Sequence, residues 1–411
     1  MFQILNKCRV CGSKELTKVL SLGNQSLTGV FPKTQETLVP KGPVDLVRCS
    51  SGCGLVQLEQ TYDLENMYGD NYGYRSGLNQ SMVKHLENKV IKILSYVQLN
   101  DNDLVIDIGS NDATTLKFYP EDKYRLVGVD PSAGKFRSFY TGNIQLITDF
   151  FSKKILNNHG VTDKAKIITS FSMFYDLEDP VSFVRDVSEV LSDDGVWVFE
   201  QSYLPSMLEA NSFDTICQEH LEFYSLEVIM YILEKASMRI ADIEFNDING
   251  GSFSIVAVKI NSDLVINSEK ISNALKAELS LNLKSSDIYN KFKERIKSQH
   301  EKLINLLKEI NSSGKSIFGL GASTKGNVLL QYYNITADLL PAIAEVNPDK
   351  FGSYTPGTLI PLIDESELLA KKPDYLLVLP WHFKDFFINS KKFKGIKLVF
   401  PLPEVTIVEV K

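Results

Sequence analysis

The chain has 411 residues, which at about 150 residues per domain suggests two or three domains. Hydrophobic residues make up 44% and charged residues 23%, so a disordered or fibrous chain is excluded. The 44 Lys and Arg against 51 Asp and Glu give a net charge of -7, which argues against a nucleic-acid partner. No segment approaches the roughly 18 apolar residues of a membrane span, and residues 1–7 lack a signal-peptide layout. We therefore expect a cytoplasmic protein without a membrane partner.

Cysteines mark the first feature along the chain. Four of the five form two close pairs: Cys8, Cys11, Cys49 and Cys53. Two such pairs build a tetrahedral thiolate site for Zn²⁺, and four thiolates leave no open position, so the zinc would be structural. Gly12 and Gly54 follow the pairs and let backbone amides turn toward the sulfurs. The alternatives are unrelated buried cysteines or a redox CxxC. We predict a small zinc module within residues 1–80.

Tyrosines are dense in the Gly-, Asn- and Asp-rich stretch 67–79. One interpretation is an ordered loop that presents hydroxyls to a cleft, with Tyr74, and Tyr224 from later in the chain, as substrate-binding residues. The other is an aromatic packing surface between domains, which the spacing alone favours.

Residues 104–109 predict a strand followed by a tight turn and a helix-friendly stretch. This is the first unit of a doubly wound sheet, which binds ligands at the carboxyl ends of its strands. A second strand, 126–130, ends in Asp130, which is placed to accept both ribose hydroxyls. The turn at Gly109 lacks the second glycine of a dinucleotide-binding motif. Asp107 before the first turn and Asp130 after the second strand instead favour an S-adenosylmethionine (SAM) methyltransferase.

The next segments fit the same fold. Strands are predicted at 144–149, 166–170 and 195–200, and 238–245 and 252–259 form an antiparallel pair around Asn249-Gly250-Gly251. We expect this domain to span residues 81–262, with Phe150 and Phe151 flanking the adenine. The residues expected to hold SAM are Asp107, Gly109, Asn111, Asp130, Pro131, Asp149, Phe150 and Ser172.

His220 lies between the fifth strand and the next helix, on the side of the sheet where a substrate meets the methyl donor. Histidine suits proton abstraction near neutral pH, because its unperturbed pKa is about 6.5. The neighbouring Glu219 and Glu222 can orient the ring or favour its protonated form. A structural role is the alternative for a lone loop histidine, but the location favours catalysis.

The last part of the chain predicts a second nucleotide-type domain, residues 263–411. Apolar residues spaced three, four and seven apart predict a long amphipathic helix over 285–310. A strand at 315–318 then enters the glycine-containing turn 319–327, and further strands are predicted at 340–345, 375–379 and 397–400. A glycine turn before a helix lets backbone amides approach a phosphate. Substrate binding is assigned to Ser323, Lys325 and Asn327. The alternative is a turn that serves only helix packing.

The chain resembles the SAM-dependent sugar C-methyltransferases of deoxysugar biosynthesis, which make branched sugars of the mycarose and tetronitrose type. The resemblance spans nearly the whole chain. Its motifs are CRVCGS from Cys8, CGLVQL from Cys53, YGYRSGLNQSM from Tyr72, DIGSNDATTL from Asp107, EQSYLPSML from Glu200, QEHLEFYS from Gln218, NGGSFSI from Asn249, GLGASTKGN from Gly319, YTPGTLIP from Tyr354 and PDYLLVLPWHFKD from Pro373.

The resemblance implies an α/β protein with three parts: a zinc-binding N-terminal module, a central class I SAM-methyltransferase sheet and a C-terminal Rossmann-like domain that helps to hold a nucleotide-sugar. It also implies methyl transfer to C-3′ of a nucleotide-linked 4-keto-6-deoxy sugar. His220 matches the general base of the family and Glu219 the acid beside it. The 4-keto group acidifies the C-3′ proton, so a base of histidine strength forms an enediolate without a catalytic metal. We expect a monomer or a weak homo-oligomer.

Some positions depart from the family. Cys217 and Gln218 stand where members often have Tyr and His, and Phe174 stands where some have another histidine. The polar surroundings of the base are therefore altered. Ala113 replaces a common glycine of the SAM turn, a change that is tolerated if φ there is negative.

Three other functions remain open. A sugar-nucleotide O-methyltransferase shares every binding feature and differs in the atom that is methylated. An RNA-modifying methyltransferase also pairs a cysteine zinc module with a SAM domain, although the net acidity and the second glycine turn weigh against it. A zinc scaffold without activity requires that SAM does not bind.

Overall fold

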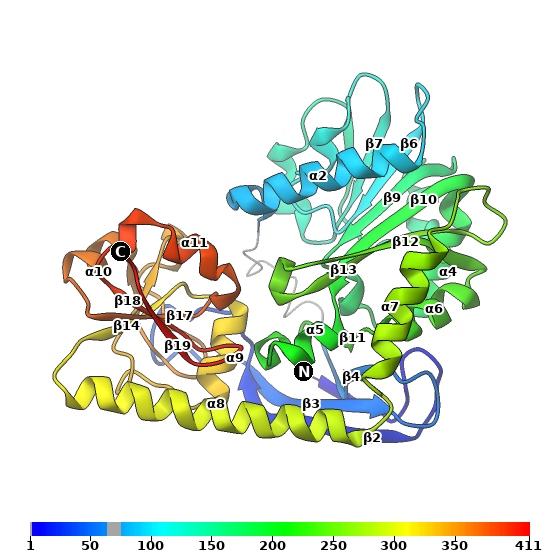
Figure 1. Cartoon of the computed structure of the whole chain (residues 1–411). Helices are drawn as coiled ribbons and strands as arrows, with labels where there is room; N and C mark the ends of the chain where they lie inside the picture. The colour runs from blue at the N-terminus through cyan, green and yellow to red at the C-terminus, as the bar shows by residue number, and fades with distance from the viewer. Residues whose placement is uncertain (1, 64–74) are drawn as a thin grey trace.

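The computed structural model describes residues 2–63 and 75–411, and the strands within them form four sheets (Figure 1). Helices and strands alternate along most of the chain. The α/β class predicted from the sequence is therefore confirmed.

Antiparallel strands build the N-terminal part, drawn in blue at the bottom of Figure 1. The larger sheet has the order β11-β4-β3-β2, and β1 pairs with β5 beside it. The strands are β1 (Phe2–Ile4), β2 (Leu16–Ser26), β3 (Lys41–Cys49), β4 (Val56–Leu58), β5 (Gln60–Tyr62) and β11 (Glu222–Phe223). One edge of this sheet, β11, thus comes from a segment far along the chain.

A seven-stranded sheet of order β12-β13-β10-β9-β6-β7-β8 forms the central part. Strands β10, β9, β6, β7 and β8 are parallel, and β13 runs antiparallel between β10 and β12. The strands are β6 (Leu104–Ile108), β7 (Arg125–Val129), β8 (Ile144–Ile147), β9 (Ala165–Phe171), β10 (Leu191–Ser202), β12 (Met238–Asn246) and β13 (Ser252–Lys259). Each strand predicted for this part is present, and β12 and β13 meet at η6 (Ile248–Gly250) as the Asn-Gly-Gly sequence predicted.

Helices cover the central sheet. They are α2 (Gln80–Tyr96), α3 (Lys153–Asn158), α4 (Pro180–Val190), α6 (Leu226–Lys235) and α7 (Ser268–Ser280). The helix α5 (Leu204–Glu209) packs instead in the core that the N-terminal and C-terminal parts share. In α4, the Asp179 side chain accepts from the Ser182 amide at 2.9 Å and Pro180 occupies the first turn, which together fix where the helix begins. Val184 and Val187 bury the inner face of α4.

The prediction of a helix after the first strand of this sheet is wrong. In residues 109–124, all of which the structure describes, a 3-10 turn, η2 (Leu116–Phe118), takes its place. Asn111 and Ala113 adopt φ angles of 49° and 60°, so the turn continues through the residues where a helix would begin. Pro120 then ends the segment, because proline cannot donate a hydrogen bond inside a helix. A second turn, η3 (Ala133–Phe139), follows β7.

A second parallel sheet forms the C-terminal part, with the order β16-β15-β14-β17-β18-β19 and β19 antiparallel at the edge. The strands are β14 (Ile317–Leu320), β15 (Ile343–Glu345), β16 (Leu362–Asp364), β17 (Tyr375–Val378), β18 (Lys397–Phe400) and β19 (Thr406–Glu409). The helices are α8 (Ser286–Ser312), α9 (Thr324–Tyr332), α10 (Glu365–Ala370) and α11 (Lys384–Ile388). In α8, Phe292, Ile296, Leu303 and Leu307 form the buried stripe that the spacing predicted.

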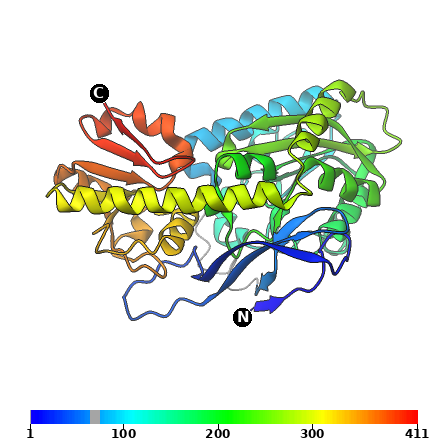
Figure 2. The same cartoon turned by 60° about the horizontal axis from the view of Figure 1, so that its bottom comes forward.

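One hydrophobic core joins the two ends of the chain. Side chains of β2, β3 and β4 pack with residues 204–223 and with the C-terminal sheet in a single buried cluster. Figure 2 shows α8 running from the C-terminal part across toward the other two parts. Residues 204–223, expected to belong to the SAM domain, therefore share their core with both other parts. Among the described residues, no helix combines the length and the apolar character that a membrane crossing needs.

Candidate active site

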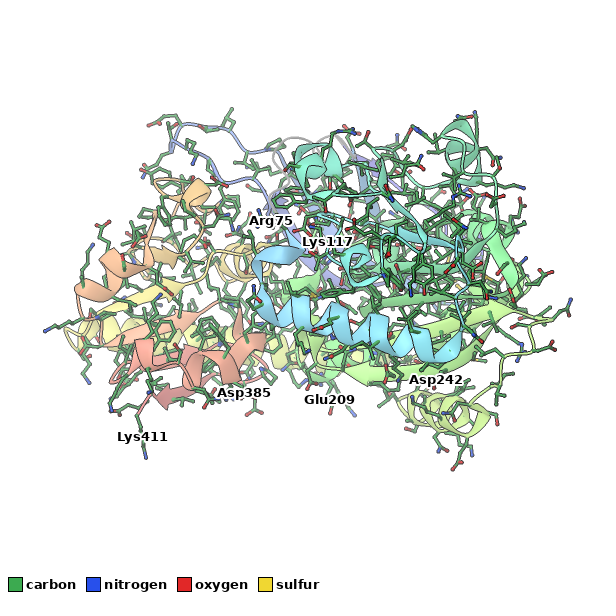
Figure 3. All side chains as sticks on the ribbon, turned by 90° about the horizontal axis from the view of Figure 1, so that it is seen from above. Arg75, Lys117, Glu209, Asp242, Asp385 and Lys411 are labelled. Atoms are coloured by element: carbon green, nitrogen blue, oxygen red, sulfur yellow. The ribbon has the colours of Figure 1, made fainter. Side chains whose placement is uncertain are left out.

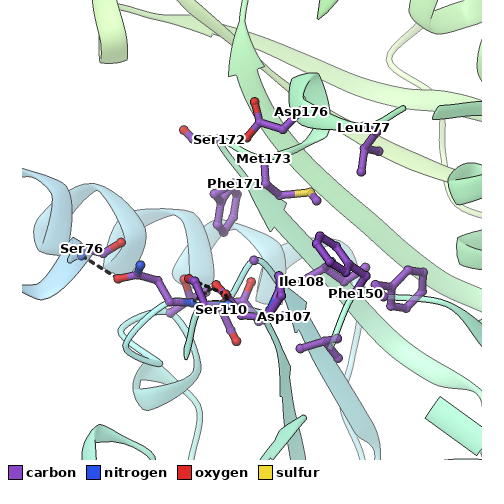
Figure 4. Close-up of a pocket in the computed structure, with 18 of the residues that line it drawn as sticks. Ser76, Asp107, Ile108, Ser110, Phe150, Phe171, Ser172, Met173, Asp176 and Leu177 are labelled. Carbon is purple, nitrogen blue, oxygen red and sulfur yellow. Dashed lines mark hydrogen bonds between the residues drawn. The ribbon is translucent and has the colours of Figure 1, made fainter. Parts of the chain in front are cut away.

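A cavity of about 390 Å³ opens at the carboxyl ends of β6, β7 and β9 (Figure 4). The predicted cofactor residues that line it are Asp107, Gly109, Asn111, Asp130, Pro131, Phe150 and Ser172. The strand ends of a parallel sheet converge at one edge, which explains why residues distant in sequence meet here. Phe150 and Phe151 both line the cavity and offer apolar faces to an aromatic ring.

Asp149 does not line this cavity. Strand β8 ends at Ile147, so Asp149 already belongs to the loop beyond the strand. Its Oδ1 accepts a hydrogen bond from the Phe150 amide at 2.7 Å. Asp149 therefore shapes the start of this loop beside Phe150, and its role in cofactor binding stays a prediction.

Asp107 is buried at the base of the cavity. Its Oδ1 accepts from the Thr169 hydroxyl at 2.6 Å. Burial raises the pKa of Asp107 to about 7, because a carboxylate loses its hydration there, and the hydrogen bond from Thr169 opposes the rise. The carboxyl thus changes charge near neutral pH, beside the place that a cationic ligand would occupy.

Asp130 follows β7 and fixes the neighbouring turns. Its Oδ2 accepts from the Asn111 amide at 2.9 Å, and its Oδ1 accepts from the Ser132 amide and hydroxyl, both at 2.7 Å. A carboxylate offers about four acceptor sites, so Asp130 keeps one for a ribose hydroxyl. An acid at this strand end and aromatic faces nearby fit SAM.

The turn after β6 differs from the expectation at one residue. Ala113 has a φ of 60°, not the negative φ under which alanine is tolerated without strain. A left-handed alanine costs roughly 1–2 kcal/mol. Its side chain is fully buried in the core with Val105 and Leu126, and this burial offsets part of the strain.

Backbone amides close one rim of the cavity, which the sequence did not predict. The amide of Ser76 donates to Asn111 Oδ1 at 3.0 Å (Figure 4). The amide of Gly77 donates to Asp112 Oδ2, also at 3.0 Å. Arg75 approaches Asp112 at 3.4 Å. The Arg75 guanidinium also lies over the Phe139 ring, as does the Lys117 ammonium, and Figure 3 shows the two cations as neighbours. This rim precedes α2, whose Met82 and Leu86 line the cavity as well.

His220 lies behind the cavity wall rather than in its lining. Its Nδ1 is 2.7 Å from the Thr215 carbonyl oxygen, and its ring meets the Tyr175 ring edge-on at 4.5 Å. The Leu221 amide donates to the Tyr175 carbonyl at 2.8 Å. Because Asp176 lines the cavity, η4 (Phe174–Asp176) lies between His220 and the cofactor residues.

Glu219 is half-buried next to this histidine. Burial raises the pKa of its carboxyl, and the adjacent His220 lowers it again. The carboxyl faces the N-terminal part, since a side chain added at Gly29 would lie 3.1 Å from Glu219 Oε1. The catalytic roles of His220 and Glu219 stay predictions.

The two tyrosines predicted to bind substrate have different outcomes. Tyr74 lies outside the described residues. Tyr224 is fully buried and stacks on Phe174, with ring centroids 5.2 Å apart. Its hydroxyl belongs to the buried region around Arg9 and Cys53. The structure therefore does not bring Tyr224 to the cavity.

The two side chains at positions 217 and 218, shortly before His220, are buried. Gln218 donates from Nε2 to the Gln25 carbonyl at 2.9 Å, and Cys217 is 1% exposed. Burial raises the pKa of the Cys217 thiol above its usual range. Both side chains therefore pack the loop into the core.

The turn after β14 connects to the central part. Lys325 Nζ donates a short hydrogen bond to the Asn249 carbonyl, and Asn249 Nδ2 donates to Ser172 Oγ at 3.2 Å. Ser323 caps α9 by accepting from the Gly326 amide at 3.1 Å. These contacts place Lys325 at a junction between domains, one side chain away from the cofactor cavity.

Asn327 serves a different junction. It is 1% exposed, and its Nδ2 donates to the Thr28 carbonyl at 2.7 Å. This side chain fixes α9 to the end of β2, so the structure gives it a packing role. Substrate binding by Ser323, Lys325 and Asn327 stays a prediction.

Three groups around Lys325 were not predicted. Asp214 Oδ2 accepts from Trp381 Nε1 at 2.7 Å, and burial raises the pKa of Asp214 while Lys325 lowers it. Burial and the nearby Lys325 lower the pKa of His382 to about 3, which keeps its imidazole neutral. The motif from Pro373 contains Trp381 and His382, and this was the only signal for them in the sequence.

The four predicted zinc ligands come together in the N-terminal part. Their sulfur atoms all lie within 4.8 Å of one another, and the pairs Cys8–Cys53 and Cys11–Cys49 are 3.5 Å apart. Tetrahedral zinc with Zn–S bonds of about 2.3 Å needs sulfurs roughly 3.8 Å apart, so the cluster fits the metal. Gly52 lies within the second pair, and a Cβ added there would lie 2.5 Å from Cys11 Sγ, so this close approach of the backbone to the sulfurs needs glycine.

Comparison with known proteins gives three family matches in chain order. The model described as "Putative zinc binding domain" matches residues 8–68, "Methyltransferase domain" matches 82–240 and "C-methyltransferase C-terminal domain" matches 247–403. These descriptions confirm the prediction of a zinc-binding methyltransferase.

One curated relative matches over nearly the whole chain. C-methyltransferase NovU of Streptomyces niveus is 27% identical over 419 residues, 98% of this chain and 97% of that protein. Among solved structures, a SAM-dependent methyltransferase of Clostridium acetobutylicum is 16% identical with a TM-score of 0.34, covering 43% of this chain and 92% of that one. The N-methyltransferase NodS of Bradyrhizobium japonicum is 11% identical with a TM-score of 0.31, covering 44% and 97%. The three family matches identify the chain as a SAM-dependent methyltransferase with the zinc-binding and C-terminal domains of C-methyltransferases.

Proposed function

We propose that this protein transfers a methyl group from SAM to C-3′ of a nucleotide-linked 4-keto-6-deoxy sugar. The name of its relative NovU supports transfer to carbon, as does the C-methyltransferase C-terminal domain. The sugar substrate follows from the resemblance of the sequence motifs. The observation that carries the chemistry is the contact between His220 Nδ1 and the Thr215 carbonyl.

This contact selects the form of the imidazole that a base needs. A carbonyl oxygen only accepts, so Nδ1 must carry a hydrogen and donate it. In the neutral ring the lone pair is then on Nε2, which becomes the proton acceptor. In our proposal Nε2 removes the C-3′ proton, and the 4-keto group of the sugar takes up the charge as an enediolate.

SAM supplies the methyl group as a sulfonium electrophile. The residues of this chain hold it at the ends of β6, β7 and β9, and Asp130 binds its ribose. Ser172 is the cavity residue that Asn249 contacts, so this side of the cavity lies next to η6. Glu219 is proposed to orient the base.

The nucleotide of the substrate is assigned to the turn 319–327 of the C-terminal part. Gly321 has a φ of 80°, a conformation that glycine adopts at no steric cost, and it opens the way to the N-terminus of α9. Backbone amides there favour a diphosphate. We propose the domain limits 1–80, 81–262 and 263–411, and a cytoplasmic monomer or weak homo-oligomer.

The test is an assay of full-length protein with SAM and a nucleotide-linked 4-keto-6-deoxy sugar. The product should lose its C-3′ proton signal in NMR and gain a methyl group on carbon. A methyl group on oxygen with the C-3′ proton retained would assign the O-methyltransferase function instead. RNA that is retained by the protein at low salt and methylated would assign the RNA-modifying function.

A further inference from the structure

The segment that follows His220 is a strand of the N-terminal sheet. In the ladder of β11 and β4, Glu222 lies opposite Gln57. The Leu58 amide also donates to the Leu221 carbonyl at 2.9 Å. The position of His220 therefore depends on a sheet whose other strands come from the zinc-binding part.

The segment before His220 is held by the same part. Gln218 donates to the Gln25 carbonyl, at the end of β2, at 2.9 Å. The central part contributes the Tyr175 carbonyl, which accepts from the Leu221 amide at 2.8 Å. The proposed base thus lies between two anchors on the N-terminal part and one on the central part.

A buried ion pair reinforces the anchor after His220. Arg9 Nε lies 3.3 Å from Glu222 Oε1, and the two side chains are 1% and 0% exposed. Arg9 Nη2 also donates to Thr61 Oγ1 at 2.7 Å and to the Gln60 carbonyl at 3.0 Å. The guanidinium is therefore fixed in place, and removing either charge leaves the other buried without its partner.

Arg9 connects this ion pair to the zinc ligands. It stands between Cys8 and Cys11 in the sequence, and its amide donates to Gln57 Oε1 at 2.9 Å. Gln57 is the residue opposite Glu222 in the β4–β11 ladder. Backbone and side chain of Arg9 therefore both tie the zinc-ligand turn to the strand that follows His220.

We propose that Arg9 is a positioning residue for methyl transfer: through Glu222 it fixes the segment that carries the His220 imidazole. The zinc-binding part then takes part in catalysis as well as in folding. Arg9 acts through Glu222 and does not line the cofactor cavity. This inference rests on the proposed role of His220 as the base.

The variants Arg9→Met and Glu222→Gln test the proposal in full-length, zinc-loaded protein. We expect zinc content and SAM affinity to stay at the wild-type level. We expect kcat to fall by ~10–100-fold with little change in substrate KM, because a base displaced by about 1 Å loses rate on this scale. The ring-nitrogen NMR signals of His220, assigned with His220→Asn, should shift and titrate differently with pH.

Lys18→Met is the matched control. Lys18 pairs with Asp45 at 2.8 Å in the same sheet, but the Lys18 side chain is 59% exposed and the pair lies outside the ladder with β11. The variant Lys18→Met should leave kcat and the NMR signals of His220 unchanged. If Arg9→Met is insoluble, Glu222→Gln decides the question, since its amide has the shape of the carboxyl.

Folded variants with wild-type kcat and wild-type His220 signals would overturn the proposal. A variant that loses kcat only in proportion to lost zinc or lost SAM affinity would also overturn it, in favour of a purely structural ion pair. If the wild type itself transfers no methyl group to the sugar, the proposed function fails. The His220 signals then still report whether Arg9 positions this ring.

Discussion

Lys325 of the C-terminal part donates from Nζ to the backbone carbonyl of Asn249 in the central part, and the Asn249 side chain donates to Ser172 in the cofactor cavity. Burial lowers the pKa of Lys325, and Asp214 raises it again. Two proposed binding sites, for nucleotide and for methyl donor, are therefore connected by one asparagine.

Lys325→Met should raise the KM for the sugar nucleotide and leave SAM affinity within a few fold. The substitution removes a cation from the turn 319–327 and one link between the two parts, but it keeps the bond from Asn249 to Ser172. Calorimetry with SAM and initial-rate kinetics measure the two effects.

The control for Lys325→Met is Asn249→Gly. Asn249 has a φ of 56°, which glycine adopts easily, so this variant keeps the carbonyl that Lys325 contacts and loses the bond to Ser172. Asn249→Gly should weaken the binding of SAM more than it weakens the binding of the sugar nucleotide. If Lys325→Met weakens SAM binding alone, the two ligands have been assigned to the wrong parts.

Asp130→Ala should weaken SAM binding by ~10–100-fold. The loss corresponds to ~1.4–2.8 kcal/mol, about the contribution of one charge-assisted hydrogen bond to the ribose. Asp149→Ala provides the comparison, because Asp149 is an acid after the next strand that does not line the cavity. It should change the affinity less than ~3-fold, and equal losses in the two variants would contradict the ribose assignment.

Asp107 should make the protein less stable as the pH rises from about 4 to about 7. Its folded pKa is raised to about 7 from 3.8, so the folded state holds the proton more tightly, and stability falls as the carboxyl ionises. Asp107→Asn lacks this penalty. The free energy of unfolding of Asp107→Asn minus that of the wild type should therefore increase by roughly 4 kcal/mol as the pH rises over this range, at ~1.36 kcal/mol per pH unit.

Urea unfolding of SAM-free wild type and Asp107→Asn at several pH values measures the difference, in which other titrating groups cancel. A difference that does not change between pH 4 and pH 8 would mean that Asp107 is ionised throughout.

Purified protein should contain about one zinc per chain, and Cys11→Ser should be insoluble or unfolded. Structural zinc stabilises the folded state by ~10–16 kcal/mol in small zinc-binding domains, which exceeds the stability of most domains. Elemental analysis measures the zinc. Cys217→Ser replaces the fifth cysteine, which lies outside the cluster, and should keep the metal. Soluble, active protein without zinc would contradict the assignment.

The sequence predicted those strands and turns that are determined by residues close together in the chain. Asp107 and Asp130 were placed correctly, because each comes at the end of a buried parallel strand and such ends share one edge of the sheet. Asp149 was expected at the end of a strand, but β8 ends two residues earlier than its apolar pattern suggested. A shift of this size moves a side chain from the edge of the sheet into the following loop.

Contacts between distant segments could not be predicted in this way. The strand β11 has two residues, and only its pairing with β4 defines it. The ion pair of Arg9 and Glu222 depends on this pairing, and so does the burial of Tyr224. Neither periodicity nor turn residues carry information about which segment completes a sheet.

His220→Asn should bind SAM and the keto sugar nearly normally and lose most of its turnover. Asparagine keeps a side-chain group that can donate to the Thr215 carbonyl but offers no basic nitrogen. Removing a positioned general base typically costs 10²–10⁴-fold in rate. The variant should also lose the exchange of the C-3′ proton for deuterium from solvent, which requires the base but no methyl transfer.

Glu219→Gln separates the base from its neighbour, because it removes a charge beside His220 and leaves Nε2 in place. Its turnover should fall less than that of His220→Asn, and its deuterium exchange should persist. Near-normal turnover in His220→Asn would assign the proton to another group. Loss of substrate binding together with turnover would make His220 a positioning residue, since a base that acts only in the chemical step changes kcat before it changes affinity. Exchange and binding measured on the same preparation therefore decide whether the imidazole takes the proton or only holds the sugar.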